Sequence, residues 1–223
     1  MNDLAIQVHA VSKKVTIPHG DLNILVDINL SVKLGTSAAI VGESGSGKST
    51  LLALMAGLDT PTSGRIVLLG KDLTHLSEDQ RAKLRAKRVG FVWQAFNLVP
   101  YLTALENVLL PLSLSQAEQA HERAKHWLNA VGLSARATHY PKQLSGGEQQ
   151  RVAIARAFAA QPELVFADEP TGNLDQRTGA LVSELMWEMN SKEKTTLVLV
   201  THDLKLAEHC QHQIHLQSGQ VVQ

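Results

Sequence analysis

The chain has 223 residues, 44% of them hydrophobic, and its 21 lysines and arginines balance its 21 aspartates and glutamates. This length suffices for one globular domain with a sizeable core, and the neutral charge argues against nucleic acid or an anionic membrane surface as a ligand. The chain starts without the segments of a signal peptide, and no apolar run approaches the roughly 18 residues that span a bilayer. The single cysteine, Cys210, suits a reducing compartment. We therefore expect a soluble protein that reaches a membrane only through a partner.

Apolar patterning predicts strands in the first third of the chain, a helical middle, and strands again towards the end. The predicted strands cover residues 5–11, 24–32, 37–41, 65–69, 164–167 and 196–200. A helix is predicted to start at Lys48, and helical patterning extends from about residue 103 to 161 with a break at 139–143. Another helical stretch covers 176–190. The sequence thus predicts an α/β core interrupted by a helical insert.

The segment Gly-Glu-Ser-Gly-Ser-Gly-Lys-Ser at residues 42–49 fits the pattern G-x-x-x-x-G-K-[ST] of a phosphate-binding loop. Its glycines let backbone N–H groups point at phosphates, Lys48 can reach the β- and γ-phosphates, and the Ser49 hydroxyl can bind Mg²⁺. A chance match in a glycine-containing turn is the alternative, but the match lies between a predicted strand and a predicted helix, as the motif requires. The predicted nucleotide-binding residues are Gly42, Glu43, Ser44, Gly45, Ser46, Gly47, Lys48, Ser49 and Thr50.

Two carboxylates follow the predicted strand 164–167, which is apolar on both faces. Asp168 can hold Mg²⁺ through water, and Glu169 can orient and deprotonate an attacking water molecule. Carboxylates that merely cap a strand are the alternative. A pair directly after four apolar residues, in a chain that also has a phosphate loop, favours the catalytic interpretation.

The segment Leu-Ser-Gly-Gly-Glu-Gln-Gln-Arg at residues 144–151 resembles the LSGGQ signature of ATP-binding cassette (ABC) ATPases. Ser145 precedes a run of good helix formers and is a predicted N-cap, and the two glycines would let a phosphate approach the backbone. The resemblance covers the whole chain, and implies one ABC ATPase domain over residues 1–223. Its α/β P-loop NTPase fold would comprise an N-terminal antiparallel β subdomain, a RecA-like core and a helical signature subdomain at about 95–160.

The same resemblance implies that the chain hydrolyses ATP with Mg²⁺ as a homodimer. Gln94 matches the Q-loop glutamine that senses Mg²⁺ and the membrane partner, and His202 matches the switch histidine that touches the γ-phosphate. Asp175 matches the D-loop aspartate at the dimer interface. The expected Mg²⁺ ligands are Ser49, Gln94 and Asp168. The signature residues expected to cover the ATP of the opposite subunit are Ser145, Gly146, Gly147 and Glu148.

One position departs from the family pattern. ABC ATPases usually stack adenine on an aromatic side chain upstream of the phosphate loop, and this chain has Val15 in the matching position. No Phe, Tyr or Trp precedes Phe91, so His19 is the only flat side chain nearby. Stacking on a base contributes about 1–3 kcal/mol. We therefore predict weaker ATP binding and poor discrimination between ATP and GTP.

Residues 41–46, 96–108 and 166–175 are similar to those of lipoprotein-release and macrolide-export ATPases (the MacB/LolD group), and most similar to its YbbA-like members. This implies a separate integral membrane permease with a large periplasmic domain, a position on the cytoplasmic face of the inner membrane, and export or extraction of a lipophilic or envelope substrate. Residues 94–108 would form the groove for the permease. A hydrophobic loop packed on the helical region is the alternative interpretation of that segment.

Two other functions compete with this one. A soluble ABC ATPase acting on ribosomes or DNA needs a second cassette or long insertions, and the neutral charge gives no support to a nucleic-acid partner. A regulatory adaptor that binds ATP without turnover is disfavoured by the presence of Glu169 and His202. The basic stretch at 81–88 is predicted to be a solvated helix face rather than a lipid contact.

Overall fold

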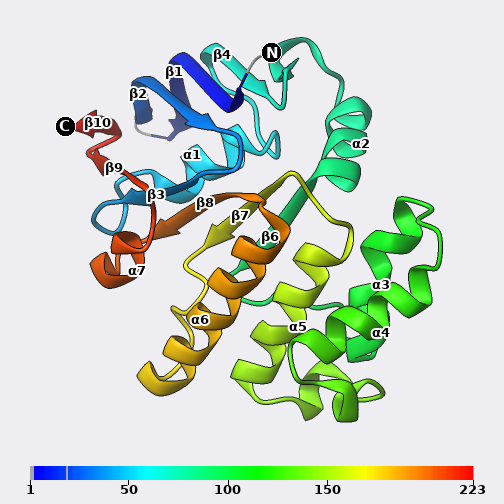
Figure 1. The fold of residues 1–223 in the computed structure, drawn as a ribbon. Helices are drawn as coiled ribbons and strands as arrows, with labels where there is room; N and C mark the ends of the chain where they lie inside the picture. Colours follow the sequence, from blue (N-terminus) through cyan, green and yellow to red (C-terminus); the bar gives the residue numbers. More distant parts are fainter. Residues whose placement is uncertain (1–2, 19, 223) are drawn as a thin grey trace. The chain divides into compact units, whose positions relative to one another are not determined.

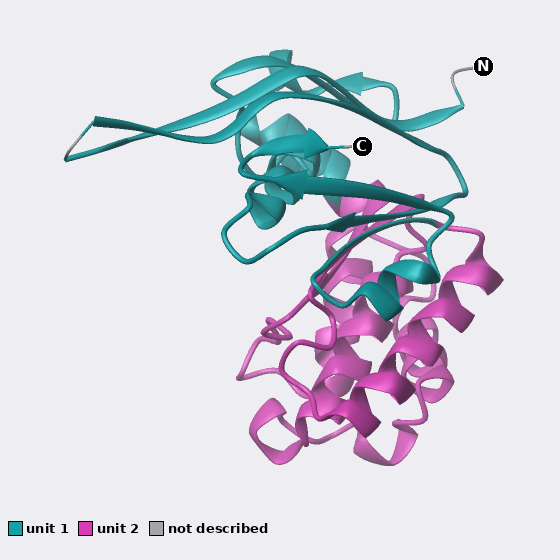
Figure 2. Cartoon of the chain, turned by 90° about the vertical axis from the view of Figure 1, so that its left-hand side faces the viewer, with its two compact units in different colours: residues 1–85, 196–223 teal, residues 86–195 magenta. Residues whose placement is uncertain are grey.

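The structure is a computed structural model that describes residues 3–18 and 20–222. The chain divides into two compact units, residues 1–85 with 196–223 (unit 1) and residues 86–195 (unit 2), which Figure 2 distinguishes by colour. The phosphate loop and His202 belong to unit 1. Gln94, the acidic pair and the signature belong to unit 2.

Unit 1 contains an antiparallel sheet, as predicted for an N-terminal β subdomain (Figure 1). Its strands, in the spatial order β2-β1-β4-β5, are β1 (Leu4–Ile17), β2 (Gly20–Lys33), β4 (Ser63–Leu68) and β5 (Lys71–Asp72). The predicted first strand ended at Val11 because polar residues interrupt the apolar pattern there. Backbone pairing with β2 continues to Ile17 nevertheless, so β1 and β2 form a longer hairpin than expected.

Unit 1 also contains a set of parallel strands with the spatial order β10-β9-β3-β8. These are β3 (Ser37–Val41), β8 (Thr196–Thr201), β9 (His212–Gln217) and β10 (Gln220–Val222), of which β10 alone runs antiparallel to its neighbour in this set. All residues of β3 and β8 are buried, which explains their continuous apolar sequences. The helices of this unit are α1 (Lys48–Met55) and α7 (Leu204–Glu208), with a 3₁₀ turn η1 (Leu73–His75).

Helix α2 (Glu78–Arg88) carries the basic stretch. Arg81 and Arg85 both form ion pairs with Glu78, at 2.9 and 2.7 Å, and Lys83 and Lys87 are exposed. Lys83 and Lys87 therefore match the predicted solvated face, whereas the side chains of Arg81 and Arg85 are only 14% and 16% exposed.

Unit 2 places four helices beside a parallel strand pair, β6 (Val89–Trp93) and β7 (Leu164–Asp168). Helices α3 and α4 both contact α5, and the Trp127 and Phe158 rings stack with their centroids 6.0 Å apart. The helices are α3 (Ala104–Leu114), α4 (Ala120–Ala130), α5 (Gly146–Ala159) and α6 (Gln176–Glu193). The predicted break at 139–143 contains the 3₁₀ turn η3 (Pro141–Gln143), and a second 3₁₀ turn, η2 (Ser134–Arg136), precedes it.

A buried amide shapes the segment between Gln94 and α3. Asn107 is fully buried; its Oδ1 accepts a hydrogen bond from Val99 N at 2.8 Å, and its Nδ2 donates to the carbonyls of Val99, Leu102 and Thr103. One side chain thereby joins the turn at residues 99–103 to helix α3, in addition to the backbone bonds that Val99 O and Thr103 O accept.

The predicted helical insert at about 95–160 corresponds to α3, α4 and α5, whereas the assignment of the whole chain to one domain stays a prediction. Within the described residues, no helix combines the length and the apolar character needed to cross a membrane.

Candidate functional site

The phosphate loop connects the buried strand β3 to helix α1 in unit 1. Gly45 and Gly47 have φ angles of 79° and 101°, a region that residues with a Cβ rarely adopt. Lys48 is 8% exposed, and its Nζ donates to the carbonyls of Gly42 and Glu43, both at 2.8 Å. The ammonium group is thus held over the start of the loop, where it can meet an anion together with the backbone N–H groups of the helix start.

The loop fits closely between β2 and the C-terminal strands. A Cβ atom on Gly42 would lie 2.2 Å from the carbonyl oxygen of Leu216, and one on Gly47 would lie 2.9 Å from Leu25 Cδ2. Gly219 N, in the turn after β9, donates to Ser46 O at 3.1 Å. Sequence reasoning missed this contribution of the C-terminal hairpin, for which the Ser-Gly turn at residues 218–219 was the available signal.

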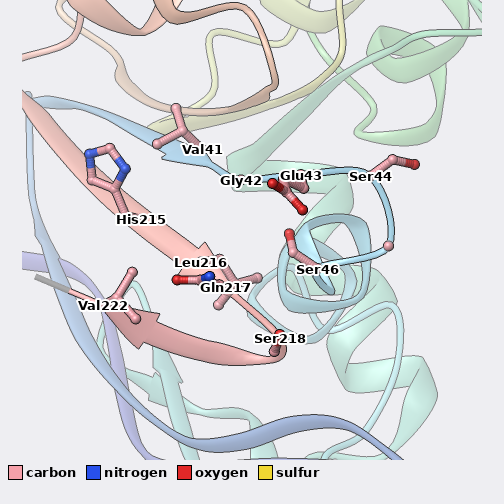
Figure 3. Close-up of a pocket in the computed structure, with 11 residues that line it drawn as sticks. Val41, Gly42, Glu43, Ser44, Ser46, His215, Leu216, Gln217, Ser218 and Val222 are labelled. Atoms are coloured by element: carbon pink, nitrogen blue, oxygen red, sulfur yellow. The ribbon is translucent and has the colours of Figure 1, made fainter.

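A cavity of about 380 Å³ lies beside the loop, between residues 41–46 and the C-terminal strands. Figure 3 shows the loop on one side of it and β9 with β10, including His215 and Val222, on the other. Ser46, which is 6% exposed, also lines the cavity, and its Oγ has no hydrogen-bond partner among the described residues. An unsatisfied buried hydroxyl in a glycine-rich loop suits an anionic ligand such as a phosphate chain, whereas Lys48 and Ser49 do not line this cavity.

His202 leaves the sheet at the same edge as the phosphate loop. Strands β3 and β8 are parallel, with Val41 paired to Thr201, so Gly42 and His202 follow neighbouring strands. The turn is fixed locally: Thr201 Oγ1 accepts from Asp203 N at 3.0 Å, and Asp203 caps α7 by accepting from Lys205 N at 2.9 Å. The structure therefore places the predicted histidine beside the predicted phosphate loop within unit 1.

Gln94 and the acidic pair share an edge in unit 2. Strands β6 and β7 are parallel, with Trp93 paired to Asp168, so Gln94 and Glu169 follow neighbouring strands. Gln94 Nε2 donates to Asn173 Oδ1 at 3.3 Å, and Asn173 Nδ2 donates back to Gln94 O at 2.9 Å. This use of the amide nitrogen leaves the amide oxygen of Gln94 as the group that could face a cation.

Glu169 has an unusual backbone conformation. Its φ angle is 44°, in the left-handed region that residues other than glycine seldom occupy. Its carbonyl accepts from Gly172 N at 3.0 Å, and the next carbonyl, that of Pro170, accepts from the buried side chain of Gln150. A Cβ atom on Gly172 would lie 2.8 Å from Gln94 Nε2, so this glycine gives Gln94 room. Backbone strain of this kind persists only where neighbouring groups hold it in place.

The signature forms the start of α5 as predicted. Ser145 is the N-cap: its Oγ accepts from Glu148 N at 3.3 Å, and its own N–H donates to Glu148 Oε2 at 2.8 Å. Arg136 Nε donates to Glu148 Oε1 at 3.0 Å. The Ser145 backbone N–H and then the Arg136 guanidinium hold the pKa of Glu148 below its ordinary value.

The signature glycines also have a packing role that sequence reasoning missed. A Cβ atom on Gly147 would lie 2.4 Å from Thr178 Cγ2, and one on Gly146 would lie 3.3 Å from Leu174 Cδ2. Asp175, between these two contacts, is the N-cap of α6: its Oδ1 accepts from Thr178 N at 3.1 Å, and its hydrogen bonds with Thr178 lower its pKa. The start of α5 and the start of α6 are therefore fitted to each other.

Comparison with known proteins now decides the family. A model described as "ABC transporter" matches residues 25–172. The ABC transporter ATP-binding protein YbbA of Escherichia coli K12 and that of Shigella flexneri are each 52% identical over 218 residues, covering 97% of this chain and 96% of the relative. The chain belongs to the ABC transporter family.

Solved structures agree with this assignment. Two dimeric structures of the cassette MJ0796, one in a post-hydrolysis state bound to ADP and Pi and one described as a bacterial ABC transporter cassette, have TM-scores of 0.90. They are 40% and 41% identical, and each comparison covers 98% of this chain and 97% of the other. The predicted fold class is confirmed, and the chain is an ATP-binding ATPase of the ABC transporter type.

Val15, the expected match for the adenine-stacking position of ABC ATPases, lies on β1. Val15 pairs across the hairpin with Leu22, and the two side chains are 39% and 51% exposed. An exposed pair of aliphatic side chains therefore occupies this position, where an aromatic side chain was expected from the family. Sequence reasoning found Val15 but missed Leu22, and His19 lies outside the described residues.

Glu148 gives a pH-dependent test of the signature's local structure. Because its folded pKa is below its unfolded pKa, ionised Glu148 stabilises the fold fully above the ordinary glutamate value of 4.5, and this contribution is lost as the pH falls through the folded value. We expect Glu148→Gln to lower the free energy of unfolding by about 0.5–1 kcal/mol at pH 7, because the neutral amide weakens the hydrogen bond from the Ser145 N–H and removes the ion pair with Arg136. Urea unfolding at a series of pH values measures this difference, which should shrink towards zero at acidic pH.

The matched control is Glu184→Gln on the exposed face of α6, which should show no such pH-dependent difference. A stability difference for Glu148→Gln that stays constant across the series would contradict the assigned role of the ionised carboxylate.

Proposed function

We propose that this ABC ATPase binds ATP and Mg²⁺ on its phosphate loop, hydrolyses the ATP with Glu169 as general base, and drives a separate permease. The observation that carries the proposal is the register of the parallel strands. In unit 1, Val41 pairs with Thr201, so Gly42 and His202 follow the ends of paired strands. In unit 2, Trp93 pairs with Asp168, so Gln94 and Glu169 do the same. Within each pair, this carboxyl end of the strands is where α/β proteins bind their ligands.

Each residue is assigned the role that its chemistry allows. Lys48 and the loop N–H groups neutralise the phosphates, and His202 contacts the γ-phosphate. Glu169 accepts a proton from water as the water oxygen bonds to the γ-phosphorus; the bond to the bridging oxygen breaks, and ADP leaves with that oxygen. In this proposal the hydroxyl of Ser49, the amide oxygen of Gln94 and the carboxylate of Asp168 hold Mg²⁺, since all three offer the oxygen ligands that this ion prefers. The bound ion would neutralise charge that develops on the phosphate oxygens.

The proposed active form is a homodimer with two shared ATP sites. The signature is a second helix start rich in glycine, separate from the phosphate loop, and the similar cassette MJ0796 is described as dimeric in both solved structures. We assign Ser145, Gly146, Gly147 and Glu148 to the ATP of the partner subunit, and Asp175 to the dimer interface. The nucleotide supplies acceptor oxygens for backbone N–H groups at the start of α5.

The proposed permease contact is an apolar groove of about 250 Å³ in unit 2. Phe91 and Trp93 stack at 5.1 Å on one wall, and Leu114 of α3, 70% exposed, lies on another. Of the segment 94–108 that the sequence suggested, Asn97 lines this groove, while most of its lining comes from β6, α3 and α5. The resemblance of residues 41–46, 96–108 and 166–175 to the MacB/LolD group supports the proposal of an envelope or lipophilic substrate and of a position on the cytoplasmic face of the inner membrane.

Replacing Glu169 tests the hydrolytic step. We expect Glu169→Gln to lower ATP turnover by on the order of 10²-fold or more, because the general base is lost while the nucleotide contacts remain. Phosphate release measures turnover, and size-exclusion chromatography with ATP and Mg²⁺ should show a stable dimer. Glu184→Gln, an exposed glutamate changed in the same way, should behave as wild type. Wild-type turnover in Glu169→Gln would remove this residue from the mechanism.

Replacing Val15 tests the adenine position. We expect Val15→Tyr to strengthen ATP binding by about tenfold and to increase the preference for ATP over GTP, since a stacked base gains about 1–3 kcal/mol. Competition between the nucleotides, measured in the Glu169→Gln background, gives both affinities. Val221→Tyr is the control, because Val221 has a similar exposure of 37% on β10. Two outcomes would contradict the hypothesis. The wild type could already bind ATP as tightly as relatives with an aromatic residue, or the preference for ATP over GTP could be present in the wild type and lost in Val15→Tyr.

Capture of the partner tests the transporter assignment. Tagged Glu169→Gln, held closed by ATP and Mg²⁺ in solubilised membranes, should co-purify with an integral membrane permease that has a large periplasmic domain, identified by mass spectrometry. Leu114→Arg should weaken this capture because it places a charge in the groove. Leu34→Arg, an exposed leucine in unit 1, should leave it intact. Recovery of ribosomal or DNA-bound proteins without a membrane partner would favour the soluble alternative instead.

A further inference from the structure

Gln150 is a buried polar side chain that none of the proposed catalytic steps uses. It is fully buried on α5, and its Nε2 donates to the carbonyl of Pro170, the residue after Glu169. Its Oε1 has no hydrogen-bond partner among the described residues. The orientation of the amide is fixed by chemistry, because a carbonyl can only accept and the nitrogen must therefore face Pro170.

Two opposing effects act on this side chain. A buried amide oxygen without a partner is unfavourable, whereas an apolar side chain of similar length would avoid that cost but leave the buried Pro170 carbonyl without this donor. What an apolar side chain cannot do is donate to Pro170. The distinctive contribution of Gln150 is therefore that one hydrogen bond.

The bond acts on the segment that carries the proposed base. Glu169 has the left-handed φ of 44°, and the residues after it are held from two directions. Asn173 and Gln94 exchange hydrogen bonds on one side, and Gln150 binds the Pro170 carbonyl on the other. With its carbonyl fixed, the peptide unit after Pro170 cannot rotate freely, and this restrains the backbone segment that holds Glu169 in its left-handed conformation.

The same side chain belongs to the signature helix. Gly147 and Gln150 are three residues apart on α5 and therefore share a face, on which Gly147 packs against Thr178. A shift of the helix start would move the Gln150 donor relative to Pro170. The bond thus links the signature of a chain to the Glu169 segment of the same chain.

We propose that Gln150 is a positioning residue for ATP hydrolysis, which couples the signature helix to the conformation of the Glu169–Pro170 segment. This inference rests on the proposed role of Glu169 as the base. Because Gln150 acts on the base and not on the phosphate loop, it affects the rate of the chemical step and leaves ATP binding unchanged.

The test compares Gln150→Met with Gln149→Met. Methionine keeps the length and the unbranched shape of glutamine and removes the donor. Gln149 is the matched control, since its Nε2 also donates to a backbone carbonyl, that of Leu144, away from Glu169. We expect Gln150→Met to lower kcat about tenfold with KM for ATP changed less than about twofold, the pattern of an interaction needed only for the chemical step. Gln149→Met should change both by less than about twofold.

Hydrogen exchange reports whether the backbone segment after Glu169 is held in place. The amides of Gly172 and Leu174, which donate to Glu169 O and Thr171 O, should exchange faster in Gln150→Met than in Gln149→Met, while the core strand β7 stays protected. Unchanged kcat and unchanged exchange at these amides would overturn the proposal. A fall in kcat that comes with an equal loss of ATP binding and faster exchange in β7 would also overturn it, because it would show a structural role.

Gln150→Glu keeps the test valid if the methionine variant does not fold. Its ionised carboxylate would oppose the Pro170 carbonyl, whereas its protonated form can donate to it, and burial raises the pKa of the introduced carboxyl. Turnover relative to wild type should therefore recover as the pH falls, and a flat ratio across pH would contradict the role of the donor. Failure of the base assignment itself is seen separately, as retained turnover in Glu169→Gln.

Discussion

The parallel register of β3 is the constraint on which the candidate site in unit 1 depends. Its five buried residues pair with β8 on one side and β9 on the other, so that Val41 is opposite both Thr201 and His215. Three chain segments that are distant in sequence therefore leave the sheet at one edge. The close approach of Gly42 to the Leu216 carbonyl, where no Cβ fits, follows from the same register. A shift of one residue in this register would change the position of His202 relative to the loop and remove the opposition of Val41 to Thr201.

Most of the fold was predictable because the pattern of apolar residues is strong. Strand 37–41 has the predicted bounds, and the helix predicted to start at Lys48 does so, since a buried strand, a glycine loop and an amphipathic helix differ clearly in sequence. The long β1–β2 hairpin was underestimated because Lys13 and Lys14 break the apolar alternation while their backbone pairing continues. Cross-strand hydrogen bonds do not depend on side-chain polarity, so patterning alone could not reveal them.

Within the site, the residues that belong to a sequence motif were predictable, whereas the residues that contact them and hold them in place were not. Ser145 was predicted as an N-cap from its local context, and the structure confirms it. The closeness of Gly147 to Thr178, the pairing of Glu148 with Arg136, and the turn at Gly219 behind the phosphate loop join residues that are far apart in sequence. Such contacts depend on tertiary packing, which a single sequence does not show. The catalytic assignments of Glu169, Gln94 and His202 still come from motif and register together.

The two glycine-rich segments require glycine for different physical reasons. In the phosphate loop, Gly45 and Gly47 supply positive φ angles, so the backbone can curl around a ligand. In the signature, Gly146 and Gly147 lie within or at the start of a regular helix and lack this conformation; there the absent Cβ lets α5 approach Leu174 and Thr178. A substitution at Gly147 would therefore force the Thr178 side chain or α6 to shift even if no phosphate were present. It follows that intolerance of the signature to larger residues is not by itself evidence of ligand contact, because helix packing imposes the same requirement.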